Sequence, residues 1–127
     1  MGRAQPVSES ELEIMQVLWK HGGKMMLSPM MEALETQGKK WKTNTVLTFL
    51  SRLSEKGMLR TEKEGRLNQY VALCTEEEYL SGLTLSFVND VYGGDAKGLV
   101  AALLKQDSLS SQDMEELRAF WEEGGNA

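Results

Sequence analysis

One segment of the chain, Thr43 to Gly57, carries side chains that could hydrogen-bond to the edges of nucleic acid bases. Its sequence is TNTVLTFLSRLSEKG, and at about 100° per residue Asn44 and Thr48 share one side of a helix, flanked by Leu47. Asn can form a bidentate pair with adenine, Thr can donate or accept a hydrogen bond, and an exposed Leu can contact a thymine methyl group. This set favours DNA half-sites that contain A·T pairs. The alternative is a solvated surface stripe with no role.

The opposite side of the same helix belongs to a hydrophobic core. Apolar residues recur there at i, i+3, i+4 and i+7, the spacing that stacks side chains into one stripe. They are Val46, Phe49, Leu50 and Leu53. Gly57 ends the helix at the position that favours glycine. Solvated helix faces usually carry Glu, Lys and Gln, so helix propensity alone does not explain the Asn and Thr residues on the other side.

Two helices precede this segment. We expect the first to run from about Glu9 to Lys20, capped by Ser8 or Ser10. Ser28 is expected to cap the second, with Pro29 at its first helical position, where proline is common. The letters KMML between the two helices predict a short extended piece.

A β-hairpin is expected after the polar helix, because MLRTEKEGRLNQYVAL predicts two strands around a turn at Glu64-Gly65. Three helices followed by a hairpin is the element order of a winged helix-turn-helix. In that fold the helix after the second turn enters the major groove and the hairpin reaches along the DNA backbone. The predicted fold is therefore mostly α with a small β-hairpin wing. Residues 1–74 would form the winged helix-turn-helix DNA-binding domain and residues 75–127 a helical dimerisation domain.

Apolar stripes predict three more helices in the rear half of the chain. Thr75 and Glu78 are expected to form a capping box at the first of them, and Ser110 and Asp113 at the last. So small a unit buries too little apolar surface alone, so we expect a second copy of the chain to cover it. The alternative is that these helices pack back onto the front half of the same chain. The expected dimer contacts are Leu80, Leu83, Phe87, Val91, Leu99, Val100, Leu103, Leu104, Phe120 and Trp121.

Charge is divided unevenly along the chain, whose formal net charge is −5. Residues 1–73 contain 11 Lys and Arg against 8 Asp and Glu, a net charge of +3, whereas residues 74–127 contain 3 against 11, a net charge of −8. This asymmetry indicates a front half that meets a polyanion and a rear half that does not. The total of +3 is weak evidence by itself, because affinity for phosphates depends on clustering.

Composition excludes several classes of protein. The single cysteine, Cys74, cannot form an internal disulfide, and with one histidine, His21, the chain offers no Cys/His metal cluster. Catalytic and cofactor motifs are missing too, so we expect no enzyme and no cofactor. No apolar run approaches the roughly 18 residues that cross a bilayer, and the first residues lack the apolar core of a signal peptide. We therefore expect a cytoplasmic protein with no membrane partner.

From Ser8 to about Glu122, the chain resembles the penicillinase repressor family of transcriptional repressors, which includes BlaI, MecI and CopY. The matching segments are SESELEIMQVLW, TNTVLTFLSRLSEKGML, GRLNQYVAL, FVNDVYGGDAKGLVAALL and LSSQDMEELRAFW. The combination of R-L-x-x-K-G at Arg52 to Gly57, Tyr70 and the late LSSQDMEEL segment is fairly specific. The resemblance implies a homodimer in which each winged helix binds half of a palindromic operator and the rear helices interlock.

The resemblance also implies which residues contact DNA. Base contacts in the family come from the first turns of the third helix, and those positions match Asn44, Thr45, Leu47 and Thr48. In the penicillinase and methicillin branch a basic residue replaces Leu47 and a lysine replaces Asn44, so a different operator is implied. The complete expected DNA-binding set is Lys42, Thr43, Asn44, Thr45, Leu47, Thr48, Arg52, Lys63 and Arg66.

Four cations of that set, Lys42, Arg52, Lys63 and Arg66, are expected on phosphates, together with the amide groups of the first helical turn. Arg52 has a competing role, because Glu55 or Glu62 could hold it in an ion pair within the chain.

A further alternative concerns the function of the whole protein. The winged helix could serve protein–protein contact without DNA binding, because a fold does not determine a function.

Relief of repression is implied only by the resemblance. In the penicillinase branch a membrane sensor system leads to cleavage by a regulatory protease, and the matching bond here is Ala102–Leu103. The flanking residues differ from the Asn-Phe of that branch. The alternative, which the residues themselves favour, is that both are core residues of a dimerisation helix. The copper-responsive branch carries a cysteine-rich tail, whereas this chain ends FWEEGGNA, which excludes copper sensing through that motif.

Overall fold

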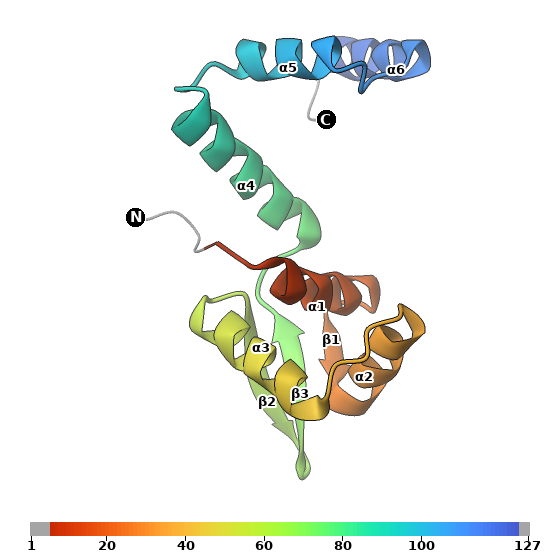
Figure 1. The fold of residues 1–127 in the computed structure, drawn as a ribbon, viewed down its shortest axis with the longest axis vertical. Helices are drawn as coiled ribbons and strands as arrows, with labels where there is room; N and C mark the ends of the chain where they lie inside the picture. The colour runs from red at the N-terminus through yellow and green to blue at the C-terminus, as the bar shows by residue number, and fades with distance from the viewer. Residues whose placement is uncertain (1–5, 125–127) are drawn as a thin grey trace. The chain divides into compact units, whose positions relative to one another are not determined.

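The computed structural model of the chain describes residues 6–124. These residues form two compact units, which divide between residues 83 and 84 (Figure 1). The division falls later in the chain than the boundary after residue 74 that we expect from the sequence, and the assignment of a DNA-binding and a dimerisation domain stays a prediction. The helices and strands are α1 (Glu9–Lys20), β1 (Lys24–Met26), α2 (Leu27–Thr36), α3 (Thr43–Glu55), β2 (Leu59–Glu64), β3 (Leu67–Ala72), α4 (Glu76–Val91), α5 (Ala96–Lys105) and α6 (Ser111–Glu122).

The mostly helical fold with a small sheet is confirmed. The first unit contains three helices and an antiparallel sheet with the strand order β1-β3-β2. The KMML piece predicted as extended contains β1, which pairs with β3 through the register Lys24↔Val71 and Met26↔Gln69. Within this unit α3 lies beside the β2–β3 hairpin (Figure 1). The hairpin is the predicted wing.

Two details of the predicted boundaries are wrong. Ser28 does not cap α2, because β1 runs directly into the helix and the N-cap is Met26, which makes no side-chain cap hydrogen bond. Pro29 therefore lies at the third helical position, still inside the first turn, where backbone N–H groups have no intrahelical acceptor and proline costs no hydrogen bond. The predicted turn at Glu64-Gly65 is also one residue early. Glu64 still pairs with Leu67 in the sheet.

Local capping explains the first helix. Of the two serines considered, Ser8 is the cap: its hydroxyl accepts from the Glu11 amide at 3.1 Å, and the Glu11 carboxylate accepts from the Ser8 amide at 3.0 Å. This is a complete capping box. The helix ends at Lys20, as predicted.

The core of the first unit joins all of its elements. The apolar stripe predicted on α3 is confirmed, since Val46, Leu50 and Leu53 are buried, and Phe49 packs edge-on against Trp41 with ring centroids 5.2 Å apart. The side chains buried in this core are Ile14, Met15, Val17, Leu18, Met25, Met30, Leu34, Val46, Leu50, Leu53, Met58, Leu59, Tyr70 and Tyr79. Such a core fixes α3 on one side and leaves its opposite side in solvent.

The start of α4 belongs to this first unit. The predicted capping box is present, with Thr75 and Glu78 exchanging backbone and side-chain hydrogen bonds of 2.9 and 3.0 Å. Tyr79 is buried, and its ring lies 5.8 Å from that of Trp19. The Trp19 indole also donates to the Cys74 carbonyl at 2.8 Å. These contacts tie the end of the hairpin to α1.

The second unit contains the rest of α4 together with α5 and α6. Asp95 caps α5 through the Gly98 amide, and the predicted capping box of Ser110 and Asp113 starts α6. Neither α5 nor α6 has a buried residue. Local hydrogen bonds therefore cap the N-termini of α5 and α6, but few apolar contacts bury their side chains.

Candidate nucleic-acid interface

The solvent side of α3 presents the polar residues predicted to read bases. Asn44 and Thr48 are exposed, Thr45 is half-buried, and Leu47 is 37% exposed beside them. The Thr48 hydroxyl donates to the Asn44 carbonyl at 3.0 Å, so in this structure its lone pairs are available to accept a hydrogen bond. The side-chain amide of Asn44 forms no hydrogen bond with the described residues. It keeps both donor and acceptor for an external partner.

The first turn of α3 also offers backbone donors. Lys42 is the N-cap and makes no side-chain cap hydrogen bond, and the first turn contains no acidic residue. The N–H groups at Thr43, Asn44 and Thr45 therefore have neither an intrahelical acceptor nor a capping side chain. With the exposed Lys42 ammonium nearby, this end of the helix is suited to an anion such as a phosphate.

The expected competing role of Arg52 is not seen. Among residues 6–124 neither Glu55 nor Glu62 forms an ion pair with Arg52, and Glu62 pairs instead with Arg60. Arg52 is exposed and stands on the same flank of α3 as Thr45. Its guanidinium is therefore available for a phosphate.

The wing presents one face to α3, and its character changes along the hairpin. Alternate residues of a strand share a face, and directly opposed residues of paired strands lie on the same face. Buried Leu59 opposes Ala72 near α3, Thr61 opposes Tyr70 in the middle, and Lys63 opposes Asn68 toward the tip. Along this face the side chains are thus apolar near α3, hydroxyl-bearing in the middle and cationic toward the tip. Lys63 lies on this face, whereas Arg60 lies on the opposite face of the strand. Arg66 lies in the two-residue loop at the tip beside Gly65, whose φ is +66°.

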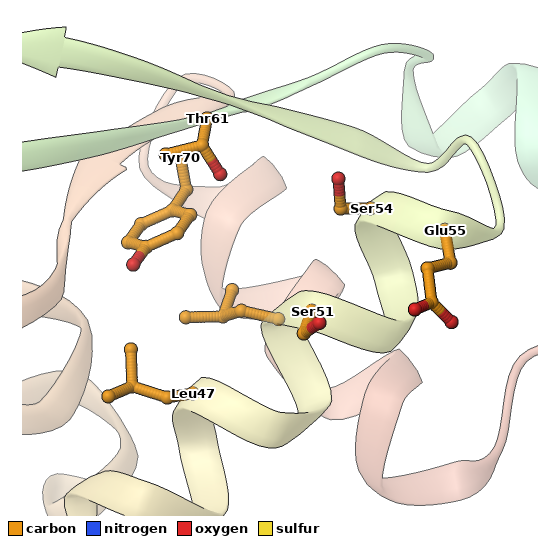
Figure 2. Close-up of a pocket in the computed structure, with 7 residues that line it drawn as sticks. Leu47, Ser51, Ser54, Glu55, Thr61 and Tyr70 are labelled. Atoms are coloured by element: carbon orange, nitrogen blue, oxygen red, sulfur yellow. The ribbon is translucent and has the colours of Figure 1, made fainter.

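A groove of about 270 Å³ separates α3 from the wing (Figure 2). Its described lining residues are Leu47, Leu50, Ser51, Ser54, Glu55, Thr61 and Tyr70. Four of these carry hydroxyl groups and only Glu55 carries a charge. Leu47 joins the groove to the polar face of α3, so the groove continues the surface that is predicted to contact DNA.

A buried ion pair holds the far end of α3. Glu11 on α1 is 2% exposed, and its carboxylate accepts a hydrogen bond of 2.6 Å from the ammonium of Lys56, the C-cap of α3. Burial alone would raise the pKa of Glu11, but the bonds from Lys56 and Ser8 outweigh it and hold the pKa below its ordinary value. At the other end, the Lys39 ammonium pairs with Glu13 at 2.6 Å and lies 5.7 Å from the Trp41 ring. Both ends of α3 are thereby anchored to α1.

Sequence reasoning missed the hydroxyl residues of the groove. The sequence patterns assign no role in DNA contact to Ser51, Ser54, Thr61 or Tyr70. The register of the hairpin is the signal that could have found them, because it sets Thr61 opposite Tyr70 on the face toward α3. The predicted turn, one residue early, hid that register.

The predicted dimer contacts, of which Leu80 and Leu83 belong to the first unit and the others to the second, are largely exposed. Leu99 is half-buried, and the remaining members are exposed, up to 58% for Phe120 and 78% for Trp121. Val88, which was not in the predicted set, is the buried apolar residue near the end of α4. Ala102 is half-buried and Leu103 is exposed on α5. An apolar surface of this kind costs free energy while it faces water.

Two features are absent from the part of the chain that the structure describes. None of its helices combines the length and the apolar character that crossing a membrane requires. Within residues 6–124, no three His, Cys, Asp or Glu side chains come together in a way that could hold a metal ion.

The chain is similar to characterised proteins over nearly its whole length. The sequence model of the family described as penicillinase repressor matches residues 7–123. The penicillinase repressor of Bacillus licheniformis is 34% identical over 126 residues, which cover 99% of this chain and 97% of that protein. The methicillin resistance regulatory protein MecI of Staphylococcus aureus strain N315 is 30% identical over 114 residues, covering 88% of this chain and 89% of that one.

A solved structure is similar to the front of the chain. It is the solution structure of Bacillus licheniformis BlaI, in its monomeric form and in complex with the blaP half-operator. It is 34% identical, with a TM-score of 0.51, and the match covers 62% of this chain and 94% of that one. The similarity therefore extends to a protein whose solved structure is a complex with a half-operator.

Proposed function

This chain belongs to the penicillinase repressor family, and we propose that it acts as a homodimer whose two α3 helices read the halves of a palindromic DNA operator. It is a DNA-binding transcriptional repressor, as are its relatives. We place its action in the cytoplasm. Because the family is one of repressors, we propose no catalytic role and no cofactor.

The observation that carries the DNA-binding proposal is the two-sided character of α3. One side is held by the core and by the Glu11–Lys56 pair, and the other presents Asn44, Thr48 and Leu47 around an uncapped helix start. A rigid helix with hydrogen-bonding groups on its solvent side is suited to direct readout in the major groove. Lys42, Arg52, Lys63 and Arg66 then meet phosphates and fix the register.

The proposal that the repressor is a homodimer is supported by the exposed apolar surface of the rear helices. A symmetric dimer buries the same patch on both copies, so exposed leucines of one chain can cover those of the other. The reading helices of a dimer must lie about 34 Å apart, one turn of DNA, to engage both half-sites. We propose that the residues after the wing set the distance between the two reading helices.

Proteolytic relief of repression would act on α5. The Ala102 carbonyl accepts from the Gln106 amide at 3.1 Å, so the Ala102–Leu103 bond lies within hydrogen-bonded helix. A protease requires an extended backbone, and cleavage there would first require α5 to unwind. We therefore favour a packing role for Ala102 and Leu103 in the dimer, with cleavage by a regulatory protease as the second candidate.

One selection experiment tests the whole proposal. The full chain is incubated with random duplex DNA, and bound fragments are recovered and sequenced. We expect a palindrome whose half-site centres lie about 10 base pairs apart and contain A·T pairs. Recovery of DNA fragments that share no sequence motif would contradict sequence-specific binding to an operator.

A salt titration separates DNA binding from the alternative, a winged helix used for protein–protein contact. DNA affinity of the repressor should fall steeply with rising salt, because cations on phosphates release counterions. A protein-contact module should show no DNA affinity at low salt.

A further inference from the structure

We infer that Gly82, in the middle of α4, is a hinge that lets each winged helix follow the spacing of the two half-sites in the operator. The inference rests on the proposed function, because spacing matters only to a dimer that reads two half-sites. It adds a conformational property to that function. The residues considered so far contact DNA or a second copy of the chain, whereas Gly82 acts through its backbone alone.

Packing holds α4 toward its two ends and leaves its middle exposed. The helix is continuous, yet the two compact units divide within it, between residues 83 and 84. Near its start Tyr79 is buried in the core of the first unit and packs against Trp19, and near its end Val88 is buried. Every residue from 80 to 85 is exposed. The middle of the helix therefore depends on its own backbone hydrogen bonds.

The residue types in this exposed segment weaken the helix further. Apart from proline, glycine has the lowest helix propensity of all residues, because it loses the most backbone freedom when a helix forms. Ser81 precedes Gly82, and glycine–serine pairs are among the few sites at which helices bend sharply. Thr84, whose Cβ is branched, is another poor helix former. The weakest part of α4 thus lies beside the division between the units.

Packing within the described residues does not explain the glycine. A Cβ atom added to Gly82 would meet no atom within 4 Å, whereas one added to Gly98 would come within 2.5 Å of the Asp95 carboxylate that caps α5. Close approach of a second copy does not explain it either, since Gly82 lies roughly 160° around the helix from Leu80 on the apolar stripe. An alanine would fit at position 82. What the glycine supplies is backbone freedom.

The position of Gly82 matches what a hinge between DNA reading and dimerisation requires. The core of the first unit holds the chain up to Tyr79, and all of the proposed dimer contacts except Leu80 follow Gly82. Hinges are a few residues that absorb changes in backbone dihedral angles between parts that stay rigid. One added base pair moves two half-sites about 3.4 Å apart and rotates them about the duplex axis. A bend at Gly82 follows that change while the dimer contacts stay intact.

Gly82→Ala is the decisive variant, because it strengthens the helix and fills only open space. Full-length proteins are titrated with operators of the selected spacing and with operators in which one or two base pairs are inserted or deleted between the half-sites. Each affinity is expressed relative to the best spacing for that protein. We expect the loss on the altered operators to be about fivefold to twentyfold greater in Gly82→Ala than in the wild type, since each dimer has two hinges and the change from Gly to Ala favours the helix by about fivefold.

Asn89→Ala is the matched control. Asn89 is exposed on the same side of α4, about two turns after Gly82 and beyond the division, and asparagine is also a poorer helix former than alanine. This variant should keep the spacing tolerance of the wild type.

Hydrogen exchange tests the hinge without DNA. In an α-helix the amides of residues 83–85 donate to carbonyls on the other side of Gly82, so their exchange reports opening at the hinge. We expect these amides to exchange about fivefold more slowly in Gly82→Ala than in the wild type.

The outcomes separate the hinge from the proposed function. Equal spacing tolerance in the wild type and Gly82→Ala, or an equally narrowed tolerance in Asn89→Ala, would overturn the hinge while leaving DNA binding by the wild type intact. Amide exchange that does not slow in Gly82→Ala would overturn it as well. A wild type without DNA affinity would overturn the proposed function itself.

Discussion

The two units of this chain leave surfaces of opposite chemistry uncovered. In the first unit a core of apolar side chains, such as Ile14, Met30 and Leu53, is fully buried, and α3 exposes amide and hydroxyl groups. In the second unit large apolar side chains are exposed as well, including Phe120 and Trp121. Polar groups that keep their hydrogen-bonding capacity suit a polar partner, whereas exposed apolar area is stabilised by apolar area. The difference indicates nucleic acid for one unit and a second copy of the chain for the other.

The largest expected effect is on the apolar surface. Leu103→Asp would place a charge in the proposed dimer contact, and an unpaired charge buried there costs about 3–5 kcal/mol. We expect the dimer dissociation constant to rise more than 100-fold, measured by sedimentation equilibrium. Operator affinity should fall with it, because one winged helix then binds alone.

Ala101→Asp is the matched control for that variant. Ala101 is exposed on the same helix, away from the stripe of Leu99, Val100, Leu103 and Leu104, and the change in charge is the same. The control should remain dimeric. If both variants stay dimeric, the rear helices are not the dimer contact and the contrast between the two units fails.

The second effect concerns the interior of the first unit. Glu11→Gln removes the charge that pairs with Lys56, and we expect the free energy of unfolding to fall by about 2–3 kcal/mol at neutral pH. Because the folded-state pKa of Glu11 lies below its ordinary value of 4.5, its contribution is present above that pH and is lost as the pH falls through the folded pKa.

Denaturant titrations of wild type and Glu11→Gln at several pH values check this sign. The two stabilities should differ at pH 7 and converge as the pH falls through the lowered folded-state pKa of Glu11. A difference that persists in acid would assign the loss to packing instead of charge. Dimerisation should be unaffected, because the pair lies within the first unit.

The contrast between the units also shows what the sequence could predict. Features set by neighbouring residues were predicted correctly: the capping boxes at Thr75 and Ser110, the core stripe of α3 and the glycine that ends it. The pairing of β1 with β3 and the convergence of Thr61 and Tyr70 on α3 depend on residues far apart in the chain, and local patterns do not contain them. The polar face of α3 could therefore be predicted, whereas the groove beside it required the structure.

The third effect tests the polar surface. Asn44→Ala removes the only amide side chain on the exposed face of α3 among the described residues and should weaken operator binding by about 1–3 kcal/mol. Affinity for random DNA should stay nearly the same, because Asn44 is proposed to read a base and not a phosphate. Parallel titrations with the two DNAs check this. Equal losses on both would assign Asn44 to the backbone and remove it from base reading.

The smallest effect comes from charge, and it has opposite signs on the two surfaces. Residues 74–127 carry a net charge of −8, so two copies repel each other when their rear helices meet, and salt screens that repulsion. DNA binding depends on attraction between cations and phosphates, which salt weakens. Raising the salt concentration should therefore tighten the dimer by about twofold to tenfold while it loosens the DNA complex. Sedimentation of the protein alone and DNA titration over the same salt series measure the two trends. Parallel weakening of both would mean that ion pairs between the copies, and not apolar contacts, hold the dimer together.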